Sequence, residues 1–356
     1  MDENIFLLII IILLIIKMLT TGNNFISEAF QDVAIAEESD SIPDVEFPFR
    51  NLVDENHKKL NILLIVAPFR EVKDEENWLK YKAMGLEFCG QSSYLEFPGK
   101  ILNPHDDFFH EERKHDYLKM VSAWLHIFRT PPQNLIDSKL PLLLMPEANM
   151  LDVSGNDHYR DETIEKIYDF IHINLDDNEQ CTPGWNWYNR NWDLAKKCLE
   201  VMCKQHNLKG AIVGRKNCKF TDACDGIVKV IPYLEYHEFQ KELQKARFLF
   251  MPNIADASPR TITQALGHNM PVLVNYNILG GWDNVISGVT GEFFTSEHDI
   301  SPAIYKLLNN YDNYTPRKWF VENKGKDNCC PILAKFLLDN YPNINNKNMK
   351  LAEIRG

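Results

Sequence analysis

The chain has 356 residues, of which 45% are hydrophobic and 25% are charged, and its formal net charge is −12. This length and composition fit two globular domains. The acidic balance excludes a non-specific nucleic-acid binder, because such a protein needs a basic surface. The eight cysteines are too few for a disulfide scaffold and do not have zinc-site spacings, so we expect free thiols in a reducing compartment.

The N-terminal segment is strongly apolar. Residues 5–16 read IFLLIIIILLII, and residues 18–19 extend the run if Lys17 snorkels, which brings it near the lower limit for crossing a bilayer. We predict a single-pass membrane anchor over residues 1–22. A cleaved signal peptide is the main alternative, although its first residues should be basic, and a buried helix is the other. Lys17 favours a cytosolic body, but one lysine leaves the orientation open.

An acidic linker and a short first domain are expected next. Residues 23–57 are polar and acidic, which is typical of a stem between a membrane and a folded body. Residues 58–160 would form the first domain, with a buried strand at Asn61–Pro68, a helix at Asp116–Phe128 and a strand at Pro141–Met145.

The second domain, residues 161–325, shows a regular alternation of strands and helices, which indicates a parallel, doubly wound sheet. The expected strands are 166–174, 210–214, 227–232, 247–251 and 271–275, and the expected helices are 191–206, 236–246 and 259–267. Residues 326–356 would form a C-terminal helix and tail, with 328–340 crossing back to the first domain.

Residues 251–294 contain the most informative pattern. Ser258 is a good N-cap, Pro259 is a good first helical residue, and Gly267-His268-Asn269 would end the helix. A helix N-terminus would then lie at the carboxyl edge of a parallel sheet, where its free N–H groups favour an anion such as a nucleotide diphosphate. Gly280-Gly281 would turn the chain after the next strand.

This segment resembles the donor-binding motif of the group-1, family 4-like retaining glycosyltransferases, which have the GT-B fold of two Rossmann-like domains. Their pattern is Glu, seven residues and Glu, followed by G-x-P-V, a glycine pair and G-x-T-G. Anchored on Pro259, the first acidic position falls on Asp256 and the second falls on Gln264. The resemblance implies that Asp256 contacts the transferred sugar and that Gln264 contacts the ribose of the donor.

Two substitutions in this pattern affect donor binding. Asp256 is one methylene shorter than glutamate. Gln264 keeps hydrogen-bonding capacity but lacks the charge that makes such bonds about twice as strong. The family also often has G-R-x-x-x-x-K after the first strand of this domain; here Arg190 takes the lysine position and Trp185 the arginine position. Arg190 would therefore bind the diphosphate, unless it only begins a surface helix.

Further donor-binding candidates follow other strands of this domain. Gly214 and Arg215 end the strand 210–214, and Arg215 is a second candidate cation or a solvated loop residue. Tyr233 occupies the stretch that lies against the nucleotide base in the family, or simply ends a strand. Arg260 in the first helical turn is unfavourable for the helix dipole, which indicates a nearby anionic ligand or a solvent-facing side chain.

The sequence therefore predicts a membrane-anchored, retaining glycosyltransferase with the GT-B fold. Its co-substrate would be a nucleotide-diphosphate sugar and its acceptor a hydroxyl of a glycan, lipid or protein. No Asp-x-Asp triplet occurs, which favours a mechanism without a metal or other cofactor. The alternative is a non-catalytic, membrane-tethered sugar-binding or scaffold protein of the same fold. A nucleotide-sugar epimerase is a third hypothesis.

Overall fold

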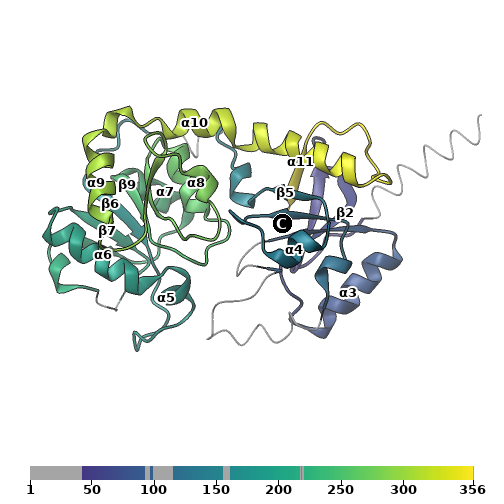
Figure 1. The fold of residues 1–356 in the computed structure, drawn as a ribbon, viewed down its shortest axis with the longest axis horizontal. Helices are drawn as coiled ribbons and strands as arrows, with labels where there is room; N and C mark the ends of the chain where they lie inside the picture. The colour runs from purple at the N-terminus through teal and green to yellow at the C-terminus, as the bar shows by residue number, and fades with distance from the viewer. Residues whose placement is uncertain are drawn as a thin grey trace, which may run out of the picture.

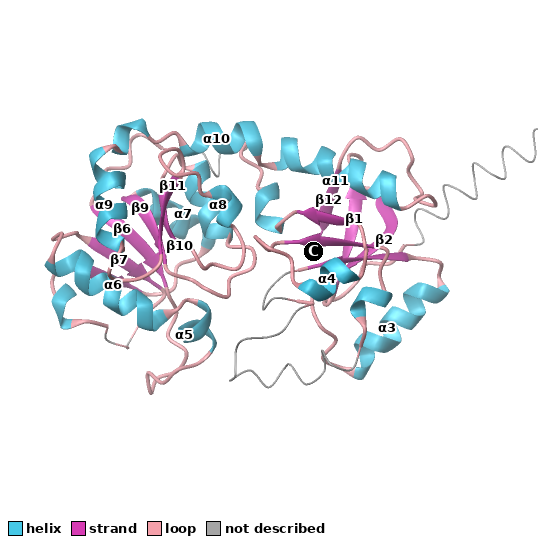
Figure 2. Cartoon of the chain, in the orientation of Figure 1, coloured by secondary structure: helices cyan, strands magenta, loops and turns pink. Residues whose placement is uncertain are grey.

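The computed structural model describes residues 42–92, 97–98, 115–154, 161–216, 218 and 220–355. In these ranges the chain forms two α/β domains, each around a six-stranded sheet (Figures 1 and 2). The predicted anchor at residues 1–22 lies outside the described residues. No helix in the described part is long and apolar enough to cross a membrane.

The first domain has the strand order β12-β1-β2-β3-β4-β5. Strands β2 to β5 are parallel, whereas β1 is antiparallel to both β2 and β12. Helices α3 (Val72–Ala83) and α4 (Gln133–Asp137) accompany the sheet. The strands are β1 (Phe49–Asp54), β2 (Lys59–Ile65), β3 (Glu87–Gln91), β4 (Ala123–His126), β5 (Leu142–Leu144) and β12 (Ala352–Arg355).

Two predictions for this domain are wrong. The helix expected at Asp116–Phe128 is instead a 3-10 turn, η3 (Tyr117–Lys119), followed by strand β4. Because β4 lies between β3 and β5 and its first three residues are buried, apolar side chains occur on both faces and their spacing does not separate strand from helix. The linker expected to reach residue 57 ends earlier, because β1 already belongs to the sheet.

The second domain confirms the predicted alternation, and the bounds given above for its five strands and three helices differ from the observed ones by at most two residues. Its sheet is wholly parallel with the order β11-β10-β9-β6-β7-β8, so the winding reverses between β6 and β9. Ligands of such sheets bind at this reversal, outside the carboxyl ends of the strands. The elements are β6 (Tyr168–Ile173), α5 (Trp185–Asn189), α6 (Trp192–Lys204), β7 (Gly210–Val213), β8 (Val228–Ile231), α7 (Tyr236–Gln244), β9 (Ala246–Met251), α8 (Arg260–Gly267), β10 (Val272–Asn275) and β11 (Gly291–Phe294).

The C-terminal segment returns to the first domain, as predicted. After α9 (Ile300–Asn309) and α10 (Pro316–Asn323), helix α11 (Lys326–Asn340) spans from one domain to the other (Figure 1). Its Leu333 and Leu337 are fully buried in the first domain's core. The residues after α11 are therefore not a separate tail, since β12 completes the first sheet.

The expectation of free thiols is wrong for four of the eight cysteines. Cys181 pairs with Cys218, and Cys203 pairs with Cys224. The partners are 37 and 21 residues apart in the sequence, so spacing alone gave no signal for them. The other four cysteines are free and buried.

Candidate functional site

Two of the predicted donor-binding residues meet at the reversal of the second sheet. Arg190 ends α5 in the crossover after β6, and Asp256 lies in the loop between β9 and α8. The Arg190 guanidinium donates to the Asp256 carboxylate, which also accepts from Asn253 Nδ2 at 3.0 Å. The backbone N–H of Ile254 donates to the carbonyl of Asn189 at 3.1 Å, which joins the two loops.

Buried polar side chains that the sequence reasoning missed lie at the carboxyl ends of β6 and β9 and at the end of α5. Each of four residues has one buried polar atom without a hydrogen-bond partner: His172 Nε2, Asn174 Nδ2, Asn189 Oδ1 and Asn253 Oδ1. His172 is neutral, because burial lowers its pKa to about 3. The sequence does contain a signal for these polar groups, because an asparagine follows each of the two apolar strands. Asn174 comes directly after β6, and Asn253 comes two residues after β9.

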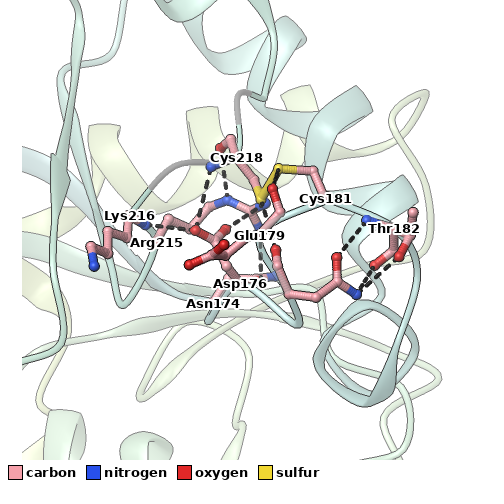
Figure 3. The surroundings of a disulfide bond; sticks show 9 residues. Asn174, Asp176, Glu179, Cys181, Thr182, Arg215, Lys216 and Cys218 are labelled. Atoms are coloured by element: carbon pink, nitrogen blue, oxygen red, sulfur yellow. Dashed lines mark hydrogen bonds and ion pairs between the residues drawn. A yellow bond between two sulfur atoms is a disulfide. The ribbon is translucent and has the colours of Figure 1, made fainter.

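Arg215 is held in a buried ion pair (Figure 3). Its guanidinium lies 2.9 Å from the Asp176 carboxylate and donates to Asn174 Oδ1 and to the Cys218 carbonyl, each at 3.1 Å. It also lies 4.1 Å from the centre of the Trp192 ring. Gly214, which precedes it, has a φ of +100°. Both arginines are thus paired with a carboxylate of the protein, Arg215 with Asp176 and Arg190 with Asp256, but the Arg190 side chain is 28% exposed and that of Arg215 only 3%.

The N-terminus of α8 differs by one residue from the prediction. Pro259 is the N-cap and Arg260 the first helical residue. Ser258 does not cap the helix, because its hydroxyl accepts from the Ala148 N–H of the first domain at 2.9 Å. Long-range contact therefore overrides the local capping preference of serine.

The predicted glycine turn after β10 is confirmed. A Cβ atom on Gly280 would lie 1.8 Å from the Ala257 carbonyl oxygen, and Gly281 has a φ of +73°. The N–H of Gly280 donates to the Asp256 carbonyl at 2.9 Å. Glycine at these positions lets the turn pack directly against the loop that carries Asp256.

Gln264 lines a cavity of about 280 Å³ between the two domains and is 9% exposed. Arg260 also lines this cavity, and its guanidinium lies 2.5 Å from Glu147 of the first domain. The anion expected near Arg260 is therefore present in the protein itself. The lining consists of Glu147, Ala148, Met150, Leu151, Tyr236, Arg260, Thr263, Gln264, Lys326, Cys330, Glu353 and Ile354.

Tyr233 is exposed over 67% of its surface, in the loop between β8 and α7. Tyr236, three residues later, lines the cavity that contains Gln264. The exposed ring of Tyr233 is available for stacking on a planar ligand.

Further contacts hold the domains together. Trp282 Nε1 donates to the Ile127 carbonyl at 2.9 Å, and the Arg129 guanidinium lies 4.0 Å from the centre of the Tyr276 ring. Asn149 donates to Asp283 at 2.8 Å. His126 ends β4 near these contacts, and burial lowers its pKa.

No protein-family model and no curated protein matches the chain. Similar solved structures include TarM, with a TM-score of 0.52, 14% identity and coverage of 70% of this chain and 49% of TarM. HepE from Anabaena, in complex with UDP, has a TM-score of 0.52 at 11% identity and covers 74% of this chain and 75% of its own. Sucrose-phosphate synthase from Thermosynechococcus elongatus has a TM-score of 0.52 at 10% identity, covering 70% and 67% respectively.

These neighbours are glycosyltransferases of the GT-B class. The chain spans about half the length of TarM. At such low identities the likeness shows the fold alone, and this chain has the GT-B fold of two Rossmann-like domains.

Proposed function

We propose that the protein is a retaining glycosyltransferase that moves a sugar from a nucleotide-diphosphate donor to a hydroxyl of a glycan, lipid or protein acceptor. The observation that carries the proposal is the contact between Arg190 and Asp256 at the reversal of the second sheet. A cation for a diphosphate and a carboxylate for sugar hydroxyls lie together where ligands of this fold bind. The complexes of HepE and of S. aureus TarM with UDP support a nucleotide donor.

Each predicted residue has a role in this proposal. Arg190 and the N-terminus of α8, at Pro259 and Arg260, bind the diphosphate, since both are electrostatically suited to an anion. Asp256 holds hydroxyls of the transferred sugar, and Gln264 faces the ribose. The remaining residues support or complete the donor site: Gly214, Arg215, Tyr233 and Ser258.

The chemistry follows from charge development. As the bond to the leaving diphosphate breaks, negative charge accumulates on its oxygens, and Arg190 stabilises it. The leaving phosphate itself assists the incoming hydroxyl, so the proposal needs no protein general base. Independence of a metal rests on the absence of an Asp-x-Asp triplet from the sequence.

The test is a thermal-shift assay of the full-length chain in mild detergent with UDP-, GDP- and ADP-sugars, without metal. We expect stabilisation by one nucleotide class, reduced by Asp256→Ala. The matched control is Asp312→Ala, which removes an exposed carboxylate on the short helix η8 (Tyr311–Asn313). No shift with any donor would contradict the proposal.

A second candidate is a non-catalytic sugar-binding or scaffold protein, which the uncharged Gln264 favours. In that case the wild-type chain would bind no nucleotide sugar and Gln264→Glu would create binding. The same thermal-shift assay distinguishes the two functions.

We further propose that residues 1–22 anchor the protein in a membrane and that its body lies in an oxidising compartment. The two disulfides support this orientation, because disulfides persist mainly outside the cytosol. The proposal reverses the orientation favoured by Lys17. The test is protease treatment of sealed membrane vesicles. Residues after the anchor that are protected until detergent is added would agree with a lumenal location, and their digestion in intact vesicles would contradict it.

A further inference from the structure

The interdomain cavity that Gln264 lines also contains the carboxylate of Glu147. Glu147 is the first residue of the 3-10 helix η4 (Glu147–Met150), which follows β5 in the first domain. Gln264 belongs to α8 of the second domain, and both residues line the same cavity. Two residues 117 positions apart in the sequence thus face one space between the domains.

The Glu147 carboxylate is oriented by two arginines. Arg260 Nη2 and Arg50 Nη1 both contact its Oε1 atom, at 2.5 Å and 3.3 Å. Neither contact uses Oε2, and the side chain is 27% exposed. The two arginines therefore orient the carboxylate through Oε1, and Oε2 can still accept hydrogen bonds from a ligand.

We propose that Glu147 supplies the negative acceptor that Gln264 lacks and binds the ribose hydroxyls of the nucleotide donor. This inference rests on the proposed function. A vicinal diol can donate both of its hydroxyls, and the carboxylate and the Gln264 amide together provide acceptors for them. Bonds to an ionised acceptor are the stronger ones, so Glu147 carries most of the ribose affinity.

A second carboxylate in the cavity is less suited to this role. Glu353 lies on β12 and forms an ion pair with Lys326 at 2.8 Å. Lys326 belongs to α11, whereas Arg260, which pairs with Glu147, belongs to α8, the helix that carries Gln264. Glu353 is consequently the matched control, since it lines the same cavity with the same chemical group.

The experiment measures binding of UDP and of 2′,3′-dideoxy-UDP to the full-length chain by calorimetry. If thermal shift selects another nucleotide class, the corresponding pair replaces them. Glu147→Gln is expected to weaken UDP binding about tenfold and to leave binding of the dideoxy nucleotide within about twofold, because the lost contact is to the ribose hydroxyls. Glu353→Gln should change neither value by more than about twofold.

The double variant Glu147→Gln/Gln264→Glu moves the charge to the position that the family uses, and it should recover most of the UDP affinity. The inference is overturned if Glu147→Gln weakens binding of both nucleotides equally or leaves UDP binding unchanged. It is also overturned if the double variant does not recover UDP affinity. If Glu147→Gln does not fold, the test becomes a comparison of UDP binding by the double variant with UDP binding by Gln264→Glu alone. If the wild-type chain binds no nucleotide at all, the proposed function itself fails.

Discussion

The disulfide between Cys181 and Cys218 should contribute measurably to stability. The double variant Cys181→Ser/Cys218→Ser releases a loop whose ends are 37 residues apart. For an isolated loop of this length, the chain-entropy model gives about 4 kcal/mol. The second disulfide, between Cys203 and Cys224, closes an overlapping loop, so part of this entropy is already removed and we expect about 3 kcal/mol.

The native structure around this disulfide should survive its removal. Asp176 accepts from the backbone N–H of Lys216 at 2.8 Å and of Cys218 at 3.3 Å, and it pairs with Arg215. These contacts keep the two loops together without the sulfur bridge. The free energy of unfolding, measured by urea denaturation of the soluble or detergent-bound protein, should therefore fall while donor binding changes little.

Thiol titration of denatured, unreduced protein provides the independent check. The chain has eight cysteines and four of them are free, so the wild-type protein should give four thiols. The double variant also gives four, because it loses only two paired cysteines. Eight thiols in wild-type protein made in an oxidising compartment, or an unchanged urea midpoint for the variant, would refute the reasoning.

Three further predictions concern the second domain. His172 is neutral when folded, with its pKa lowered to about 3 from an ordinary value of about 6.5, so stability is lost as the pH falls below about 6.5. Between pH 7.5 and 5.5 the free energy of unfolding should fall by about 1 kcal/mol in urea denaturation, and His172→Phe should remove that difference. In the same assay, Gly280→Ala should lower the free energy of unfolding by about 2–3 kcal/mol, because its Cβ would overlap the Ala257 carbonyl. The control Gly226→Ala, whose Cβ meets open space, should lower it by about 1 kcal/mol. Tyr233→Ala should leave the melting temperature unchanged but weaken nucleotide binding about five- to tenfold in calorimetry, and equal affinity would contradict its stacking role.

The second domain could be predicted from the sequence because its signals are local. Each strand is a short apolar run, each helix has an apolar face, and glycine or proline marks the turns between them. The position of Asp256 relative to Pro259 likewise followed from a contiguous motif. Its contact with Arg190 did not, because 66 residues separate the two and only the sheet order brings them together.

The first domain was harder to predict for physical reasons. Strand β12 is the last element in the described residues and pairs with β1, the first strand described, so this pairing cannot be seen from neighbouring residues in the sequence. Strand β4 has three consecutive apolar residues, Ala123 to Leu125, before His126, which removes the period-two signal of a half-buried strand. Disulfide partners were equally hidden, since Cys181 and Cys218 are joined only when the loops after β6 and β7 converge.

The residues at the start of α8 explain why a donor site is only partly visible in sequence. Local rules assigned Ser258 to the helix end and Arg260 to a ligand, yet the structure pairs both with η4 of the first domain, through Ala148 and Glu147. Opening the cleft would break these two contacts, leaving the Ala148 N–H and the Glu147 carboxylate without their partners across the cleft. The start of α8 is thus joined to the first domain by contacts that a separation of the two domains would break. If a donor ribose also contacts Glu147 and Gln264, donor binding and closure stabilise one another, because both depend on the same residues between the domains.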